Sequence, residues 1–143
     1  MGDRKTLSIG DARVDHHDVS RVARRELPVV LTEDTSWHRI AALYDVLSDA
    51  APGPVVEVNR AVAYGRAFGP GAGLAVLEEL DAAVLGDSPL VPSVRGDLLE
   101  RAGLHAQASE AFTEAAARTR NKSERAVLHH RAELSLARVS KAR

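Results

Sequence analysis

Residues 96–115 read GDLLERAGLHAQASEAFTEA, and this stretch decides the fold. A small residue, Gly96, precedes the apolar Leu99 by three positions, and Gly103 follows where a helix would end in a turn. Small and apolar residues then recur at helical spacing: Ala108, Phe112 and Ala115. Small side chains let two helices approach closely, and one large side chain fills the gap between them. The stretch therefore predicts a helical hairpin with Phe112 packed between its two helices.

The same pattern occurs earlier in the chain at an offset of 35 residues. Each key position has a counterpart of the same size class: Ala61 for Gly96, Tyr64 for Leu99, Gly73 for Ala108, Leu77 for Phe112 and Leu80 for Ala115. A tetratricopeptide repeat (TPR) has a period of about 34 residues. The offset therefore allows one inserted residue, most easily in the turn at residues 68–71. The sequence predicts an all-α fold of stacked, TPR-like antiparallel helical hairpins.

Turn residues divide the chain into an N-terminal arm, residues 1–33, and a TPR-like domain, residues 34–143. We expect the arm to pack on the repeats or to be partly disordered, with a short helix over residues 15–26 and extended chain at 27–31. About six helices follow: from an N-cap at Thr35 or Ser36 to about residue 50, then 55–68, 71–85, 90–102, 104–119 and from about 122 onward. Pro54 suits the first turn of the second helix, Gly103 a C-cap, and Asn121 or Ser123 the last N-cap. The last helix is expected to close the stack with its apolar residues: Ala126, Leu128, Ala132, Leu134, Leu136 and Val139.

The composition of the 143 residues fits one globular domain. Hydrophobic residues make up 45% of the chain but aromatic residues only 3%, so the core must consist of Ala, Val and Leu. The single Trp, Trp37, is interpreted as a packing anchor. Absence of cysteine excludes a disulfide framework, a thiol nucleophile and a cysteine-ligated zinc site. No apolar run approaches the ~18 residues of a membrane span, and no signal peptide is evident, so we expect a cytoplasmic protein.

Charge is unevenly distributed along the chain. Residues 36–117 carry five Arg and Lys against eleven Asp and Glu, whereas residues 118–143 carry eight against two. The basic end could meet an acidic or nucleic-acid partner, and the alternative is a solvated terminal helix. Direct DNA binding by this chain alone is not expected.

The sequence contains no convincing catalytic, cofactor or metal site. Residues 69–73 read GPGAG, which lacks the spacing of a dinucleotide-binding loop and is better interpreted as a turn between helices. The adjacent His129 and His130 cannot both face one metal ion. Glu78, Glu79 and Asp81 form the exposed face of a helix whose leucines are buried. We therefore expect no cofactor, no metal and no enzymatic activity, and favour a binding module.

In TPR-like stacks, the first helix of each hairpin lines the concave surface. On the predicted helix from Pro54, Asn59 and Arg66 share one side, and on the helix from Leu90, Asp97 and Arg101 occupy comparable positions. These four polar residues are the candidates for contacting a peptide or protein partner. The alternative for Asn59 is a hydrogen bond to its own helix or near Tyr64, and for Arg66 simple solvation.

The residues now described resemble the C-terminal extension of one group of extracytoplasmic-function sigma factors of the sigma-70 family. The resemblance covers about residues 34–137. It rests on DTSW at 34–37, IAALYDVL at 40–47, PVV at 54–56, NRAVA at 59–63, GP at 69–70, AGL at 72–74, Arg95, DLL at 97–99, Gly103 and Ala108. It implies a TPR-like module that makes protein–protein contacts supporting or controlling sigma activity, with core RNA polymerase or sigma-factor regions as partners.

Two departures limit what the resemblance implies. No promoter-reading helix-turn-helix is evident, and the arm is too short to hold both sigma regions that precede the extension in that family. We therefore do not expect this chain to direct promoter recognition by itself. The alternative function is a free-standing TPR-like scaffold that binds an unrelated peptide or protein. A homodimer is also compatible with a short repeat array.

Overall fold

The computed structural model describes residues 34–80 and 85–141, and these ranges form helices and short connections. The helices are α3 (Asp34–Ala50), α4 (Pro54–Phe68), α5 (Pro70–Glu78), α6 (Leu90–Arg101), α7 (His105–Arg118) and α8 (Lys122–Lys141). They confirm the predicted all-α fold of six helices. The predicted arm, with its helix at 15–26 and extended segment at 27–31, lies outside the described residues.

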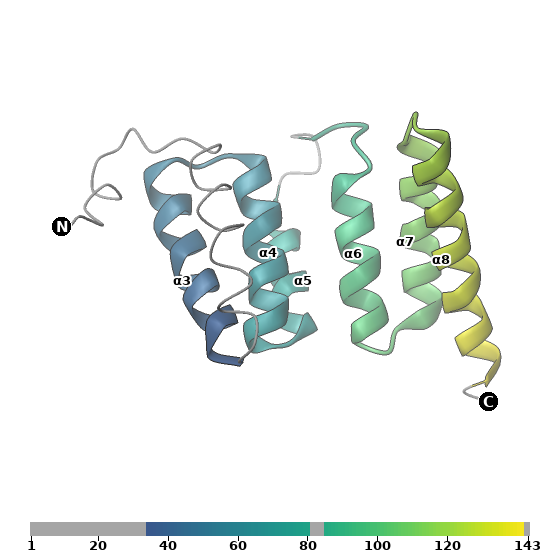
Figure 1. The fold of residues 1–143 in the computed structure, drawn as a ribbon, viewed down its shortest axis with the longest axis horizontal. Helices are drawn as coiled ribbons and strands as arrows, with labels where there is room; N and C mark the ends of the chain where they lie inside the picture. The colour runs from purple at the N-terminus through teal and green to yellow at the C-terminus, as the bar shows by residue number, and fades with distance from the viewer. Residues whose placement is uncertain (1–33, 81–84, 142–143) are drawn as a thin grey trace.

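The helices stack as antiparallel hairpins along the long axis of the molecule (Figure 1). Each helix packs against the next one in the chain, and α6 also contacts α4, which joins the α4–α5 hairpin to the α6–α7 hairpin. In the view of Figure 1, α4, α6 and α8 lie toward the reader, with α5 behind α4 and α7 behind α8. The fold is therefore a TPR-like array in which the first helices of successive hairpins share one face.

Small residues set the spacing between the helices. Gly65 of α4 and Gly73 of α5 both lie against Leu98 of α6, where an added Cβ would come within 2.5 Å and 2.9 Å of the leucine Cδ2. At Gly96 an added Cβ would lie 2.7 Å from the ring of Phe112, which is 1% exposed. The prediction that Phe112 fills the gap between two closely packed helices is confirmed.

The core consists of two clusters of mainly aliphatic side chains. The first joins α4, α5 and α6 and contains Val58, Ala61, Val76, Leu77 and Leu98. The second joins α6, α7 and α8 and contains Leu99, Ala108, Ala111, Phe112, Ala115, Ala116, Leu128 and Ala132. Leu74 packs against both clusters. The core is therefore continuous from one hairpin to the next, and it has the Ala, Val and Leu composition that the sequence predicts.

Several helix ends lie where the sequence predicts them. Pro54 occupies the first turn of α4. Gly103 follows α6 with a positive φ of 80°, and the backbone N–H of Leu104 donates to the carbonyl of Leu99 at 2.9 Å, as in a Schellman motif. Asn121 caps α8, because its side-chain oxygen accepts the N–H of Glu124 at 2.8 Å.

The boundaries of two helices differ from the prediction. The helix α3 begins at Asp34, so Thr35 and Ser36 lie within it, and neither precedes it as a cap. The helix α5 ends at Glu78, whereas the sequence predicted residue 85. Its last turn tightens, because the N–H of Leu80 donates to the carbonyl three residues back, and Leu80 and Leu85 then pack on the first cluster. These leucines therefore follow the helix and contact the core individually, and their apolar character does not show that α5 continues.

The apolar face of α8 is narrower than predicted. Leu128 and Ala132 are buried as expected, together with Ser135, at the spacing of one helical face. Leu134 and Leu136 are 45% and 57% exposed, so the expectation that they close the stack is wrong. Among the described helices, none combines the length and apolarity that crossing a membrane requires.

Candidate protein-binding surface

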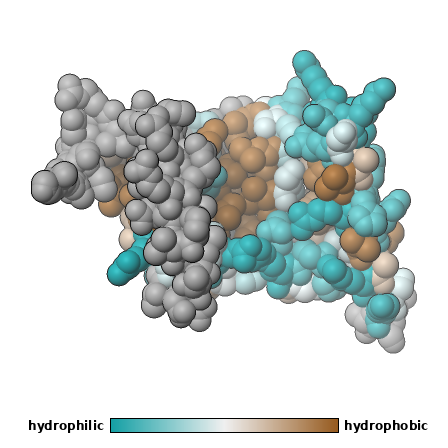
Figure 2. All heavy atoms as spheres, in the orientation of Figure 1, coloured by the Kyte–Doolittle hydropathy of each residue, from teal (hydrophilic) through white to brown (hydrophobic). Residues whose placement is uncertain are grey.

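The helices α4, α6 and α8 together present one surface, which we call the α4–α6–α8 face. Its residues recur at three- and four-residue spacing on each helix. They are Val55, Asn59, Val62 and Arg66 on α4, Val94, Asp97 and Arg101 on α6, and Val127, Arg131, Leu134 and Arg138 on α8. Figure 2 shows this side of the molecule, with an apolar area over α4 and α6 and mostly hydrophilic side chains over α8. The four residues predicted from the sequence all belong to this face.

Arg66 and Asn59 contribute polar groups from α4, and of the two only Arg66 is exposed. The Arg66 guanidinium lies over the ring of Trp37 in α3, 5.4 Å from its centroid. Within residues 34–80 and 85–141, Arg66 has no carboxylate partner, and the half-buried Asn59 makes no side-chain hydrogen bond. The described part of the structure therefore does not contain the alternative hydrogen bond from Asn59 to its own helix or to the surroundings of Tyr64.

Asp97 and Arg101 contribute a charged group from α6. The Arg101 Nε lies 3.2 Å from Asp97 Oδ2, and the other carboxylate oxygen, Oδ1, lies 3.0 Å from the guanidinium of Arg131. Arg131 also stacks on the buried ring of Phe112, with its guanidinium carbon 4.4 Å from the centroid. Asp97 is thus a bridge between α6 and α8. No hydrogen bond or ion pair in the described part of the chain links this group to Asn59 or Arg66.

A further charged centre, Glu100, connects three helices and was not predicted from the sequence. Its side chain is only 12% exposed and accepts hydrogen bonds from Ser135 and from His105, while Arg138 Nη1 lies 2.9 Å from its Oε1. Burial alone would raise the pKa of Glu100, but the hydrogen bonds from Ser135, Arg138 and His105 have the larger combined effect and lower the pKa below its ordinary value of 4.5. The ionised carboxylate therefore holds α8 against α6 and α7.

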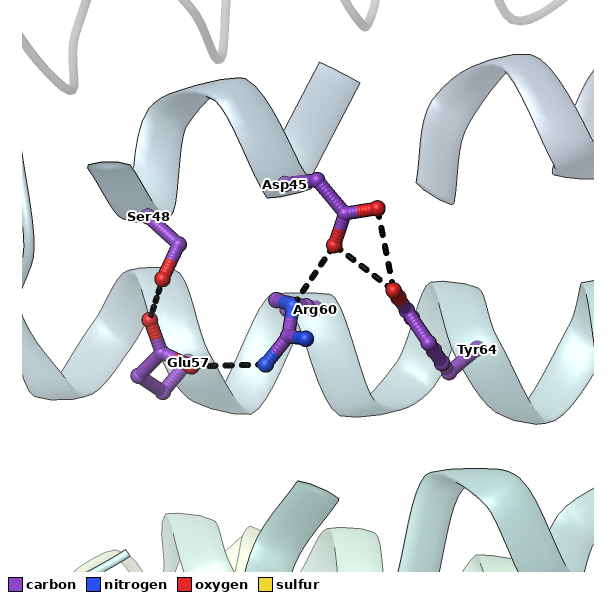
Figure 3. A network of polar contacts seen from close by, with 5 residues as sticks. All are labelled: Asp45, Ser48, Glu57, Arg60 and Tyr64. Carbon is purple, nitrogen blue, oxygen red and sulfur yellow. Dashed lines mark hydrogen bonds and ion pairs between the residues drawn. The ribbon is translucent and has the colours of Figure 1, made fainter. Parts of the chain in front are cut away.

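A second polar network joins α3 to α4 (Figure 3). Arg60 donates to Asp45 at 2.8 Å and to Glu57 at 3.2 Å, and the Tyr64 hydroxyl donates to Asp45 at 2.7 Å. Ser48 completes the network by donating to Glu57. The hydrogen bond to Asp45 raises the pKa of Tyr64 and that of Arg60. These groups satisfy one another, so this network is a structural clamp.

Several exposed side chains of α5 and α7 are acidic. They are Glu78 at the end of α5, Glu79 directly after it, and Glu110 and Glu114 on α7. Glu114 pairs with Arg118, and the same arginine donates to the carbonyls of Gly86 and Ser88. These exposed glutamates of α5 and α7 therefore do not belong to the α4–α6–α8 face, and one of them is already paired with an arginine of its own helix.

The described residues contain no group of three or more His, Cys, Asp or Glu arranged to hold a metal ion. His129 and His130 are exposed neighbours on α8. Gly69 has a positive φ of 101° and connects α4 directly to α5, so the glycine-rich stretch at 69–73 is a turn followed by a helix, as predicted.

The chain is similar to part of a longer bacterial protein. An uncharacterized protein of Rhizobium meliloti (strain 1021) is 40% identical to it over 106 residues. The match covers 74% of this chain but 24% of that protein, so the chain spans about a quarter of the length of the curated relative it matches. No protein-family model matches the chain. No solved structure matches it either.

Proposed function

We propose that the chain is a protein–protein interaction module that binds its partner on the α4–α6–α8 face. The observation that carries this proposal is the combination of exposed valines and leucine with arginines and other polar side chains on neighbouring helices. Val55, Val127 and Leu134 are 46%, 58% and 45% exposed. A surface that alternates apolar and polar groups along parallel helices offers a partner both buried area and hydrogen bonds.

We further propose that the module supports or regulates transcription initiation by contacting core RNA polymerase or a sigma region. The resemblance of residues 34–137 to sigma-factor C-terminal extensions supports this. In the Rhizobium protein, the matching segment forms part of a much longer chain. A module joined to other domains would act by raising the local concentration of its partner near those domains.

The direct test is binding of the full chain to purified core RNA polymerase and to an isolated sigma factor, measured by surface plasmon resonance. The double substitution Asn59→Ala/Arg66→Ala should abolish the interaction, since both side chains lie on the proposed surface. Arg39→Ala is the matched control, because Arg39 is exposed on α3 outside this face. Lack of binding to either protein at low salt would contradict the role in transcription. An unrelated protein captured through the same residues would indicate an adaptor.

A further inference from the structure

The charges of the α4–α6–α8 face point to a specific kind of partner. We propose that this face binds an acidic amphipathic segment of another protein, with carboxylates for the arginines and apolar side chains for the valines and leucine. This inference rests on the proposed protein-binding function and specifies the chemistry of its ligand.

The first argument is the excess of arginine over carboxylate on this face. Three of the four guanidinium groups on this face, those of Arg101, Arg131 and Arg138, share two carboxylates from the described residues, Asp97 and Glu100. Glu100 is almost fully buried and already accepts from three donors, and Asp97 is divided between two arginines. Arg66 has only an aromatic neighbour within the described ranges. Donors are thus left for carboxylates supplied from outside.

The second argument is the position of the acidic residues on the neighbouring helices. Glu57 is used by Arg60 and Ser48, and the exposed glutamates Glu78, Glu110 and Glu114 belong to α5 and α7, outside this face. These carboxylates therefore do not occupy the arginines of the α4–α6–α8 face, and an acidic partner can pair with them.

The third argument favours a protein segment over a nucleic-acid backbone. Between and beside the arginines lie Val55, Val62, Val94, Val127 and Leu134. These side chains offer a phosphate backbone no hydrogen bonds, whereas the apolar side of an amphipathic helix would cover them. The spacing of arginines among aliphatic residues thus matches glutamates or aspartates that alternate with leucines.

The test uses the full chain and a fluorescent synthetic peptide with leucines on one face and glutamates on the other. Three comparison ligands are the same peptide with glutamine for glutamate, a duplex DNA, and an unlabelled second copy of the chain. Binding is followed by anisotropy and, independently, by the emission of Trp37, whose ring lies beneath Arg66. Circular dichroism verifies that every variant is folded.

We expect the glutamate peptide to bind and the glutamine peptide to bind at least about tenfold more weakly. Arg66→Gln/Arg101→Gln should weaken binding of the glutamate peptide by roughly the same factor, while Arg39→Gln should leave its affinity unchanged. Asp97→Asn should strengthen binding several-fold, because it frees the donors of Arg101 and Arg131. A merely structural role of these residues would not produce changes in opposite directions.

Equal binding of the two peptides, or no binding, would overturn the inference. Tighter binding of duplex DNA that is lost in the arginine variant would replace it with a nucleic-acid surface, and saturable self-association through the same residues would replace it with a dimer interface. Polymerase binding without peptide binding would leave the proposed function standing and remove only this inference. Peptide binding without polymerase or sigma binding would support this inference and contradict the proposed role in transcription.

Discussion

Gly96 and Phe112 show how closely α6 and α7 pack, and a single methyl group should be enough to disturb them. In Gly96→Ala, the new Cβ would lie 2.7 Å from one ring carbon of Phe112 and 2.8 Å from another. Because the ring is buried on all sides, we expect a loss of about 1–3 kcal/mol in the free energy of unfolding, measured in urea.

The matched control for this substitution is Gly71→Ala. Gly71 lies in the first turn of α5, and a Cβ there would meet nothing within 4 Å. The control should be neutral or slightly stabilising, since alanine is less flexible than glycine in a helix. Equal losses in the two variants would mean that contact with Phe112 is not the cause.

Glu100 should make the stability of the protein depend on pH in acid. Its pKa is lower in the folded state than the ordinary value of 4.5, so its contribution is complete above pH 4.5 and is lost as the pH falls through the folded-state pKa. At pH 7, Glu100→Gln should reduce the free energy of unfolding by about 1–3 kcal/mol, because it removes the charge from three hydrogen bonds.

Urea unfolding of this variant and of the unchanged protein between pH 7 and pH 3 measures the effect. The difference in the free energy of unfolding between the two proteins should shrink below pH 4.5. A difference that stays constant across this range would show that the carboxylate is not stabilised by its charge.

Gly96, Phe112 and Glu100 also show what a sequence reveals about single residues. Gly96 and Phe112 were predictable, because a small residue and a large one recur with the repeat. Glu100 was not, because its partners Ser135 and Arg138 lie in α8, which does not follow the repeat pattern. In the sequence, a glutamate that a neighbouring helix buries cannot be distinguished from one that stays exposed, because the position of that helix is unknown.

At the scale of helices, α8 presents one face to the core and exposes leucines elsewhere. Leu128→Ala should cost about 2–5 kcal/mol in the free energy of unfolding, since the side chain is 6% exposed and packs in the second cluster. Leu136→Ala, the matched substitution at a 57% exposed position, should change it by less than about 0.5 kcal/mol. Similar losses at the two positions in thermal and urea unfolding would contradict this orientation of α8.

Helix boundaries were predictable wherever glycine, proline or asparagine marks them, as at Pro54, Gly103 and Asn121. The end of α5 was not, because Leu80 continues the three-residue spacing of Leu74 and Leu77 after the helix has ended. The buried face of α8 could not be predicted from the sequence either, because the leucines of this helix occur on several of its sides. Only the position of α6 and α7 decides which of them is buried.

At the scale of the whole molecule, Leu98 is the main connection between the two halves of the array. It is 3% exposed and lies over Gly65 and Gly73. In the unchanged protein, unfolding followed by Trp37 fluorescence and by circular dichroism should coincide. In Leu98→Ala, the lost contacts should weaken the coupling between hairpins, so that Trp37 in α3 reports a different midpoint from the total helix content.

Leu134→Ala is the control for this experiment, because it removes an exposed leucine from α8 and should leave the two probes coincident. Coincident transitions in Leu98→Ala, with only the midpoint lowered, would mean that the halves remain coupled through other contacts such as those of Leu74.

Part of the candidate binding surface could be predicted from the sequence, because helical spacing and the repeat indicate which residues share one side of the array. Helical spacing places Asn59 with Arg66 and Asp97 with Arg101, and the repeat places both helices on one side of the array. Arg131 and Arg138 appeared only as members of a basic C-terminal stretch, since nothing in the sequence indicates that they return to pair with Asp97 and Glu100 of α6.

The uneven distribution of charge along the chain also has a kinetic consequence. Residues 36–117 carry more carboxylates than cations and residues 118–143 more cations than carboxylates, so the molecule has an electric dipole along its array of helices although its formal net charge is only −1. The field of an approaching acidic protein would rotate the array before any side chains touch, so that more encounters begin in the productive orientation. Added salt should therefore slow association far more than it speeds dissociation.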